Sequence, residues 1–302
     1  MLRTPAALIA IELCGLGRLP LPGTTDTADQ FDQLPAPLGR LALQELQERL
    51  QRALSTGNAR QRVAAWLLRQ PEAADAAAQA IWANSLLAEA RAGGDALALR
   101  WASSACGYID DTAGCQQSLA TERVRAEPDN GLHRLASAPT WPGAWQHLTR
   151  AHHWHEHPGG LTATVQAALD TLQPPPAAYL RARIGRETLA RDAAQAPEGL
   201  ALLEAQCAAR PADCGQVAEQ MAASADSAAL LQQAAALGRQ AGWPDARIDA
   251  LMAATQAFHA QLPRWVDKAA GALGCAAAEP ALAHAQAVAQ HGEVRLPTAS
   301  RP

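Results

Sequence analysis

The residues best suited to chemistry lie in one short stretch, RAHHWHEHPGG at 150–160, which carries four histidines and a glutamate. Imidazole nitrogens and carboxylate oxygens are common ligands of zinc and related transition metals. On a helix, residues four apart share a face, so His153 would pair with His157 and His152 with Glu156. These four residues are candidate metal ligands, and they support one hypothesis: an all-helical metal-dependent enzyme.

A second interpretation of the same stretch is structural. The His-Glu-x-x-His motif of zinc proteases is absent, because Gly159 stands where the second histidine would be. Histidines at the end of a helix are also favoured by the helix dipole, and loop tips are usually solvated. We therefore predict a solvated turn between two helices, with no metal and no cofactor.

Other signatures of enzymes are missing from the sequence. GLGRLPLPG lacks the third glycine of a dinucleotide-binding loop, and neither a Walker A loop nor Gly-x-Ser-x-Gly occurs. The neighbouring carboxylates of Asp110 and Asp111 fit a helix cap in a turn better than an acid–base pair. We predict no catalytic residue and expect that the chain is not an enzyme.

Composition and charge exclude two classes of partner. The net charge is −4 and Lys268 is the only lysine, so the clustered basic residues of a nucleic-acid-binding surface are absent. No apolar run is long enough to span a membrane. The partner that remains is another protein or a peptide.

The fold is expected to be all-α. Phe and Tyr occur only twice each, whereas alanine and leucine, which favour helices, are abundant. Leu46, Leu50 and Leu54 follow helical spacing, and Asn58 and Asp95 stand where N-caps are expected. Short connections predict an array of antiparallel helical hairpins, on the order of a dozen to fifteen helices.

Composition also predicts the domain organisation. Residues 1–22 are expected to form an N-terminal helical segment and not a secretion signal, because Glu12 interrupts the apolar run. The polar, proline-bounded stretch 23–37 is predicted to be a linker. Residues 38–292 form the predicted helical domain, and 293–302 a loose tail.

Four cysteines form two closely spaced pairs, Cys106 with Cys115 and Cys207 with Cys214. Each pair flanks a predicted turn between two helices, where the Cα atoms can approach to the ~5.5–6 Å of a disulfide. Two disulfides would indicate an oxidising compartment, hence a periplasmic or otherwise exported protein. Reduced core thiols are the alternative and would favour the cytoplasm.

Tryptophan supplies the candidate partner contacts. The sequence has eight tryptophans, and Trp141, Trp145 and Trp154 stand near predicted turns or helix starts. Tryptophan is enriched in binding hot spots. We therefore take these three residues, with His155 beside them, as candidate partner-binding residues.

One segment resembles a tetratricopeptide repeat: AWQHLTRAHHWHEHPGGLTATVQAALDTLQPPP. Trp145 and Leu148 fit the opening of its first helix, Ala163 the small residue at the helix crossing, and Pro175 the closing proline. Residues 230–258 fit a second unit more loosely.

The cysteine-bearing hairpins are also similar to Sel1-like secreted proteins, whose disulfides tie the two helices of a repeat. Such resemblances imply a concave face that binds proteins or peptides. They favour a non-catalytic interaction module. An immunity-type protein and an adaptor protein are two specific forms that this prediction includes.

Overall fold

The computed structural model describes residues 36–71, 75–138, 145, 148, 150–193, 199–209, 211–257, 286–288 and 290–293. Across these residues the regular structure is helical, and the only β-type pairing is an isolated bridge between Asn130 and His153. The all-α prediction is confirmed. The predicted N-terminal segment, nearly all of the linker and the tail beyond residue 293 lie outside the described residues.

The helices, in chain order, are α2 (Ala36–Ser55), α3 (Ala59–Leu68), α4 (Ala76–Gly93), α5 (Ala96–Ala102), the 3₁₀ helix η2 (Ser103–Tyr108), α6 (Thr112–Ala126), α7 (Gly131–Ser137), α9 (Gly160–Asp170), α10 (Ala178–Ala193), α11 (Leu200–Ala209), α12 (Pro211–Ser224) and α13 (Ala228–Gln240). A further helix covers 245–257. None of these helices is both long and apolar enough to cross a membrane.

Local capping explains where several helices begin. Asn58 caps α3 in a reciprocal capping box with Gln61, and Asp95 caps α5 by accepting the N–H of Ala98 at 3.0 Å. Both predicted N-caps are thus confirmed. Helix α4 ends at Gly93, and its C-cap residue Gly94 has a φ of +59°, a left-handed conformation that favours glycine.

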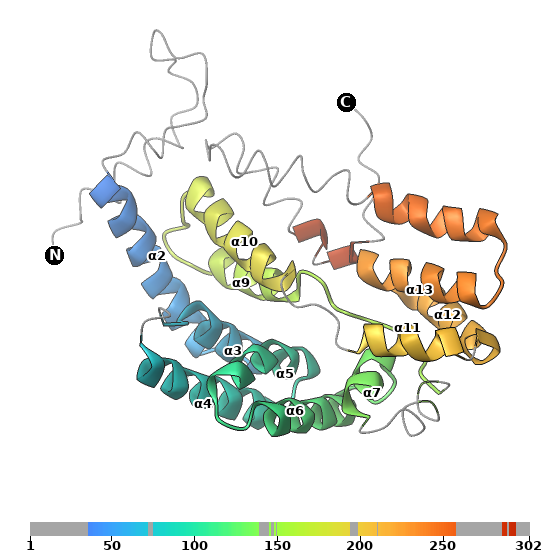
Figure 1. Ribbon diagram of the computed structural model, residues 1–302. Helices are drawn as coiled ribbons and strands as arrows, with labels where there is room; N and C mark the ends of the chain where they lie inside the picture. The colour runs from blue at the N-terminus through green and yellow to red at the C-terminus, as the bar shows by residue number, and fades with distance from the viewer. Residues whose placement is uncertain are drawn as a thin grey trace, which may run out of the picture.

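The first of two hydrophobic cores lies among α2 to α6, α9 and α10. In Figure 1, α2 to α6 follow one another along a curved layer, and α9 and α10 lie on its inner side. Its largest fully buried side chains include Leu50, Leu54, Leu86, Leu99 and Trp101. Helix α9 packs against α2 and α3, far earlier in the chain, as well as against α10.

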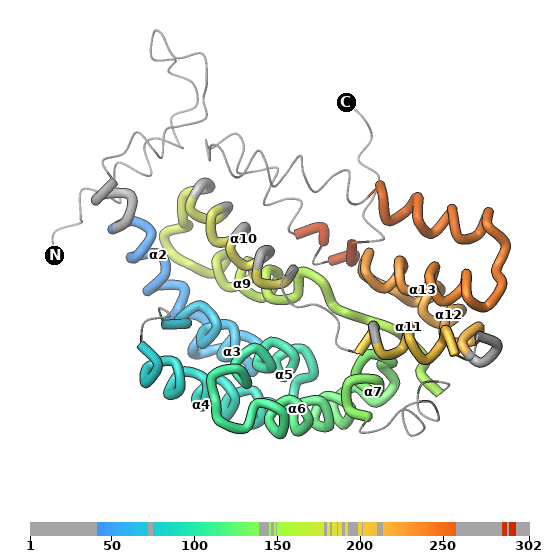
Figure 2. Tube along the Cα trace, in the orientation of Figure 1, coloured from blue at the N-terminus to red at the C-terminus, as the bar shows by residue number. Residues whose placement is uncertain are grey.

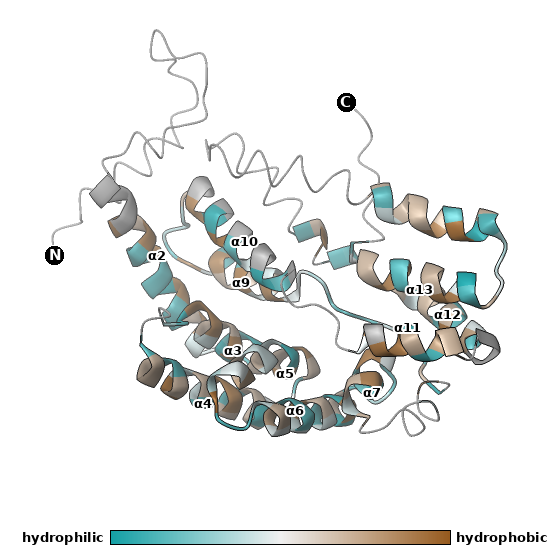
Figure 3. Ribbon diagram, in the orientation of Figure 1, coloured by the Kyte–Doolittle hydropathy of each residue, from teal (hydrophilic) through white to brown (hydrophobic). Residues whose placement is uncertain are grey.

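The second core lies among α7, α11, α12 and α13. Leu148 and Trp154 are fully buried in it, and Trp243 and Leu251 pack at its edge. In Figure 3, hydrophobic (brown) and hydrophilic (teal) residues alternate along these helices, as expected of amphipathic helices. The tetratricopeptide-like segment therefore divides between the two cores, because Leu148 belongs to the second and α9 to the first.

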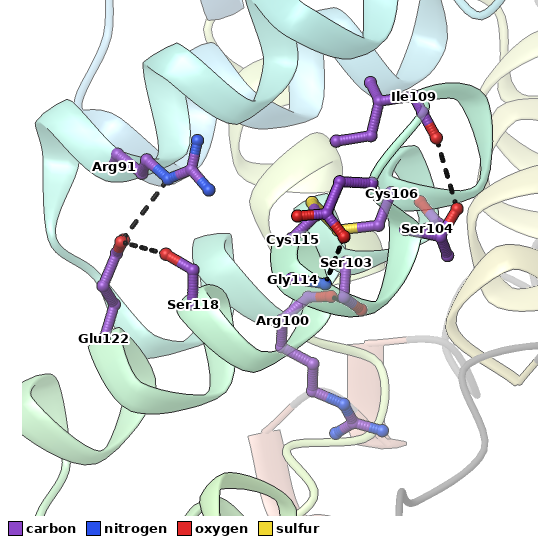
Figure 4. Close-up of a disulfide and its surroundings, with 12 residues drawn as sticks. Arg91, Arg100, Ser103, Ser104, Cys106, Ile109, Gly114, Cys115, Ser118 and Glu122 are labelled. Carbon is purple, nitrogen blue, oxygen red and sulfur yellow. Dashed lines mark hydrogen bonds and ion pairs between the residues drawn. A yellow bond between two sulfur atoms is a disulfide. The ribbon is translucent and has the colours of Figure 1, made fainter.

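Two disulfides tie neighbouring helices at the predicted positions. Cys106 of η2 bonds Cys115 in the first turn of α6, with Cα atoms 5.7 Å apart (Figure 4). Cys207 of α11 bonds Cys214 of α12, with Cα atoms 5.6 Å apart. Each bridge spans a single short connection, so it fastens a local corner and not distant parts of the chain.

Candidate metal centre

Residues 151–157 form no helix ahead of α9, and their regular pairing is the bridge at His153; the tube in Figure 2 passes here from the second core to the first. The N–H groups of His152 and His153 donate to the carbonyl of Asp129, at 3.0 and 3.3 Å, and Gly131 N–H donates to the His153 carbonyl at 2.9 Å. This pairing with the corner between α6 and α7 replaces the hydrogen bonds of a helix. The segment is therefore a non-helical connection ahead of α9, as predicted, but it is not a solvated tip, because Trp154 and Glu156 within it are buried.

Extended backbone sends successive side chains to opposite sides. On one side, the imidazoles of His153, His155 and His157 stand in a row, with ring centroids 4.6 Å apart for the first pair and 5.5 Å for the second. On the other side, Trp154 has no exposed surface and Glu156 is 8% exposed. The segment thus presents histidines from one side and buries its other side against the protein.

The four ligands considered in the sequence do not gather in one place. His152 is exposed, and Glu156 forms an ion pair with Arg100, whose Nη2 lies 2.9 Å from Oε1. His153 and His157 do lie together, although not as helical neighbours four residues apart. They meet at Glu127, which was not among the ligands predicted from the sequence.

The candidate partner-binding residues have different surroundings. The Trp154 ring is fully buried, so it is not available on the surface of the described structure. Trp145 is partly buried against the second core, and His155 is half-buried within the histidine row. Trp141 lies outside the described residues.

Glu127, which follows α6, is the centre of the cluster. Its Oε1 lies 3.0 Å from Nε2 of His153 and 3.3 Å from Nε2 of His157. Its Oε2 lies 2.8 Å from Nε2 of His133 and accepts the Asn130 amide at 3.1 Å. Burial opposes ionisation, but the hydrogen bonds from His133, His157 and Asn130 hold the pKa of Glu127 well below its ordinary value.

Two imidazoles of the cluster are shifted toward the neutral form. Burial lowers the pKa of His133, which is 3% exposed, and outweighs the opposing hydrogen bond with Glu127. Burial also lowers the pKa of His155. A neutral imidazole has a nitrogen lone pair, and this is the form that binds metal ions.

Glu127, His155 and His157 meet the distance requirement for a shared ion. One ligand atom from each lies within 4.8 Å of the other two. Two imidazoles and one carboxylate are a donor set that zinc uses in proteins. The arrangement is able to hold a divalent transition-metal ion after a small contraction of the three side chains.

The backbone of the histidine segment is held from the opposite side by α12 and the residues after it. Asp226 accepts the N–H groups of Glu156 at 2.7 Å and His157 at 2.8 Å, and Ser224 Oγ accepts that of Trp154 at 2.9 Å. His157 has a φ of +53°, a left-handed conformation that is uncommon for residues other than glycine. Asp226 thus fixes a strained residue of the site in place.

Further carboxylates lie near this support. Asp192 accepts the N–H and hydroxyl of Thr162 at the start of α9, and burial raises the pKa of Asp192 to about 6. Glu293 accepts the N–H of Ala228 at 2.9 Å, and burial raises the pKa of Glu293 to about 7. Nearby acidic groups, including Asp226, add to the rise at Glu293.

Glu127 and His133 were not among the site residues predicted from the sequence, although they stand close together in EPDNGLH at 127–133. A signal was present in the alternation of His153, His155 and His157, which is the period of extended backbone. That pattern identifies three side chains on one side, but it does not locate Glu127 opposite them.

Fold and site together define an all-helical protein with two short-range disulfides and a histidine–glutamate cluster between its two cores. Comparisons with protein-family models, curated proteins and solved structures found no match for this chain. The tetratricopeptide-like and Sel1-like resemblances therefore stay predictions.

Proposed function

We propose that this protein binds a divalent transition-metal ion, with zinc as the leading candidate. The observation that carries the proposal is the approach of Glu127, His155 and His157, whose ligand atoms lie within 4.8 Å of one another. Carboxylate and imidazole donors suit zinc, and they also suit copper and nickel. The ligands come from two segments 28 to 30 residues apart, so bound metal would join the end of α6 to the extended segment.

Binding, and not turnover, is the function proposed. Glu156 is the acidic residue within the histidine segment, but it faces away from the cluster and pairs with Arg100 at 2.9 Å. It is therefore not placed to act as a general base on a metal-bound water. Of the hypothesis of a metal-dependent enzyme we retain only metal binding. The proposed ligands also differ from those expected from the sequence.

We also propose that the protein works in an oxidising compartment after export. Two cysteine pairs at bonding distance support this location, because disulfides persist mainly outside the cytoplasm. The predicted role as an adaptor or immunity-type module stays a prediction, since no contact among the described residues bears on it.

The test is a zinc titration of the untagged full-length chain by isothermal calorimetry, after removal of metal with a chelator. We expect one ion per chain, and affinity reduced at least ~10-fold by Glu127→Gln or His157→Asn. Asparagine is chosen at position 157 because it tolerates the left-handed backbone.

His152→Asn is the matched control, because it removes an exposed histidine of the same segment that belongs to neither the cluster nor its supports. It should bind zinc as the wild type does. The proposal fails if the wild type binds no zinc, or if all three variants bind it equally well.

A further inference from the structure

We infer that His153 supplies a fourth ligand, so that Glu127, His153, His155 and His157 close the coordination sphere around one ion. This inference rests on the proposed metal binding and adds the type of site. A four-ligand site of this kind holds its ion without leaving a position for water or substrate, which is the arrangement of structural and storage sites.

The backbone places His153 with the other two histidines. In an extended segment every second residue lies on the same side, which groups positions 153, 155 and 157. The rings of His153 and His155 are tilted against each other with centroids 4.6 Å apart, closer than the 5.5 Å between His155 and His157. The ring of His153 therefore lies closer to the ring of His155, the middle histidine, than the ring of His157 does.

The distances around Glu127 Oε1 fit a tetrahedron. Zinc bonds to nitrogen and oxygen are about 2.0–2.1 Å long, so two ligands of a tetrahedral site lie about 3.3 Å apart. Nε2 of His153 lies 3.0 Å from Oε1, and Nε2 of His157 lies 3.3 Å from it. Two edges of the tetrahedron thus already have nearly the required length. His153 lies outside the group whose ligand atoms are all within 4.8 Å of one another, so its imidazole must rotate toward those of His155 and His157 to complete the site.

The other oxygen of Glu127 is held by different groups. His133 Nε2 lies 2.8 Å from Oε2, and the Asn130 amide donates to the same oxygen at 3.1 Å. This leaves Oε1 as the oxygen available to an ion, so Glu127 contributes one bond and three imidazoles complete the set of four. His133 is a positioning residue, because it acts on the ion through Glu127.

The backbone around these ligands is fixed before any ion binds. The Asn130 side chain donates to the His155 carbonyl at 2.9 Å, and Asp226 accepts the N–H of His157 at 2.8 Å. The carbonyl of His153 accepts the N–H of Gly131 at 2.9 Å. Closure of the site then requires side-chain rotation alone. Four ligands on such a fixed backbone favour an ion that accepts tetrahedral geometry, such as Zn²⁺. They are less suited to Cu²⁺, which prefers a tetragonal arrangement.

The experiment uses Co²⁺ as a spectroscopic probe for zinc in the untagged full-length chain. The wild type should give the intense visible absorption of tetrahedral Co²⁺. His153→Ala should still bind Co²⁺, with affinity reduced about 10- to 100-fold and with the weak absorption of a five- or six-coordinate ion. His153→Asn provides a second replacement, and circular dichroism checks the fold of both.

The outcomes separate this inference from the proposed function. If the wild type binds neither Zn²⁺ nor Co²⁺, the proposed function fails and the inference fails with it. If the wild type binds Co²⁺ and both His153 variants keep its affinity and spectrum, only the fourth-ligand inference is overturned. His152→Asn should leave affinity and spectrum unchanged, and loss of either in that variant would also count against the assignment.

Discussion

Replacement of Glu293 by glutamine should make the protein more stable at alkaline pH. Glu293 accepts the N–H of Ala228 at the start of α13, and its own N–H donates to the Asp226 carbonyl at 2.9 Å. Glutamine keeps a side-chain oxygen for Ala228 but carries no charge. It therefore removes the cost of burying a carboxylate and retains the hydrogen bond.

The magnitude follows from the pKa of Glu293, which burial raises from 4.5 to about 7. Asp226, Glu156 and Asp192 add negative charge nearby and act in the same direction. A carboxyl whose pKa is raised in the folded state stabilises the protein fully below its unfolded pKa, and that contribution is lost as the pH rises to about 7. At about 1.4 kcal/mol per pKa unit, the loss is about 3–4 kcal/mol.

Urea unfolding at pH 4.5 and pH 8, followed by far-ultraviolet circular dichroism, measures the effect. We expect Glu293→Gln to match the wild type at pH 4.5 and to exceed its free energy of unfolding by about 3–4 kcal/mol at pH 8. Glu204→Gln, at an exposed position of α11, is the control and should show no such dependence. Equal differences between variant and wild type at the two pH values would refute the reasoning.

Three other predictions concern the supports of the site and the corners of the fold. Cys106→Ser with Cys115→Ser should lower the free energy of unfolding by about 2–3 kcal/mol, measured in urea, and no change would mean that the bridge is not formed. Arg100→Ala should lower the free energy of unfolding by about 3–5 kcal/mol, because Glu156 is left buried without its partner. The double variant Arg100→Met with Glu156→Leu should recover most of this loss. A double variant as unstable as the single one would contradict the reasoning. His133→Ala should weaken zinc binding about 10- to 100-fold in calorimetry, and His133→Gln, which restores an N–H donor, should recover part of it; equal affinity in all three proteins would remove the positioning role.

The parts of the fold that depend on local sequence were predictable. Asn58 and Asp95 cap their helices as expected, because a cap needs only a side chain and an N–H two or three residues away. The disulfides were likewise foreseeable as one of two alternatives, since short connections bring the cysteines together. Composition was sufficient for the all-α class, because a chain so poor in aromatic and β-branched residues favours helices.

The conformation of residues 151–157 depends on distant partners. A helical extension of Trp145 and Leu148 is reasonable from sequence, but Asp129 and Asp226 bind the backbone of this segment and hold it in a non-helical conformation. Sequence spacing alone does not reveal such contacts. A helical period therefore predicts the proximity of His153 and His157 correctly but for the wrong physical reason. It does not predict the contact of either histidine with Glu127.

Because the side chains of residues 153–157 alternate between the two sides of the segment, its register decides which residues face the cluster. One residue inserted ahead of His153 would turn the three imidazoles toward the apolar interior and direct Trp154 and Glu156 toward Glu127. An insertion of two residues would restore the original alternation, so glycine insertions of one and two residues, compared for zinc binding, distinguish parity from simple lengthening. Homologous chains that keep this site are thus expected to change the length of this segment by whole dipeptides.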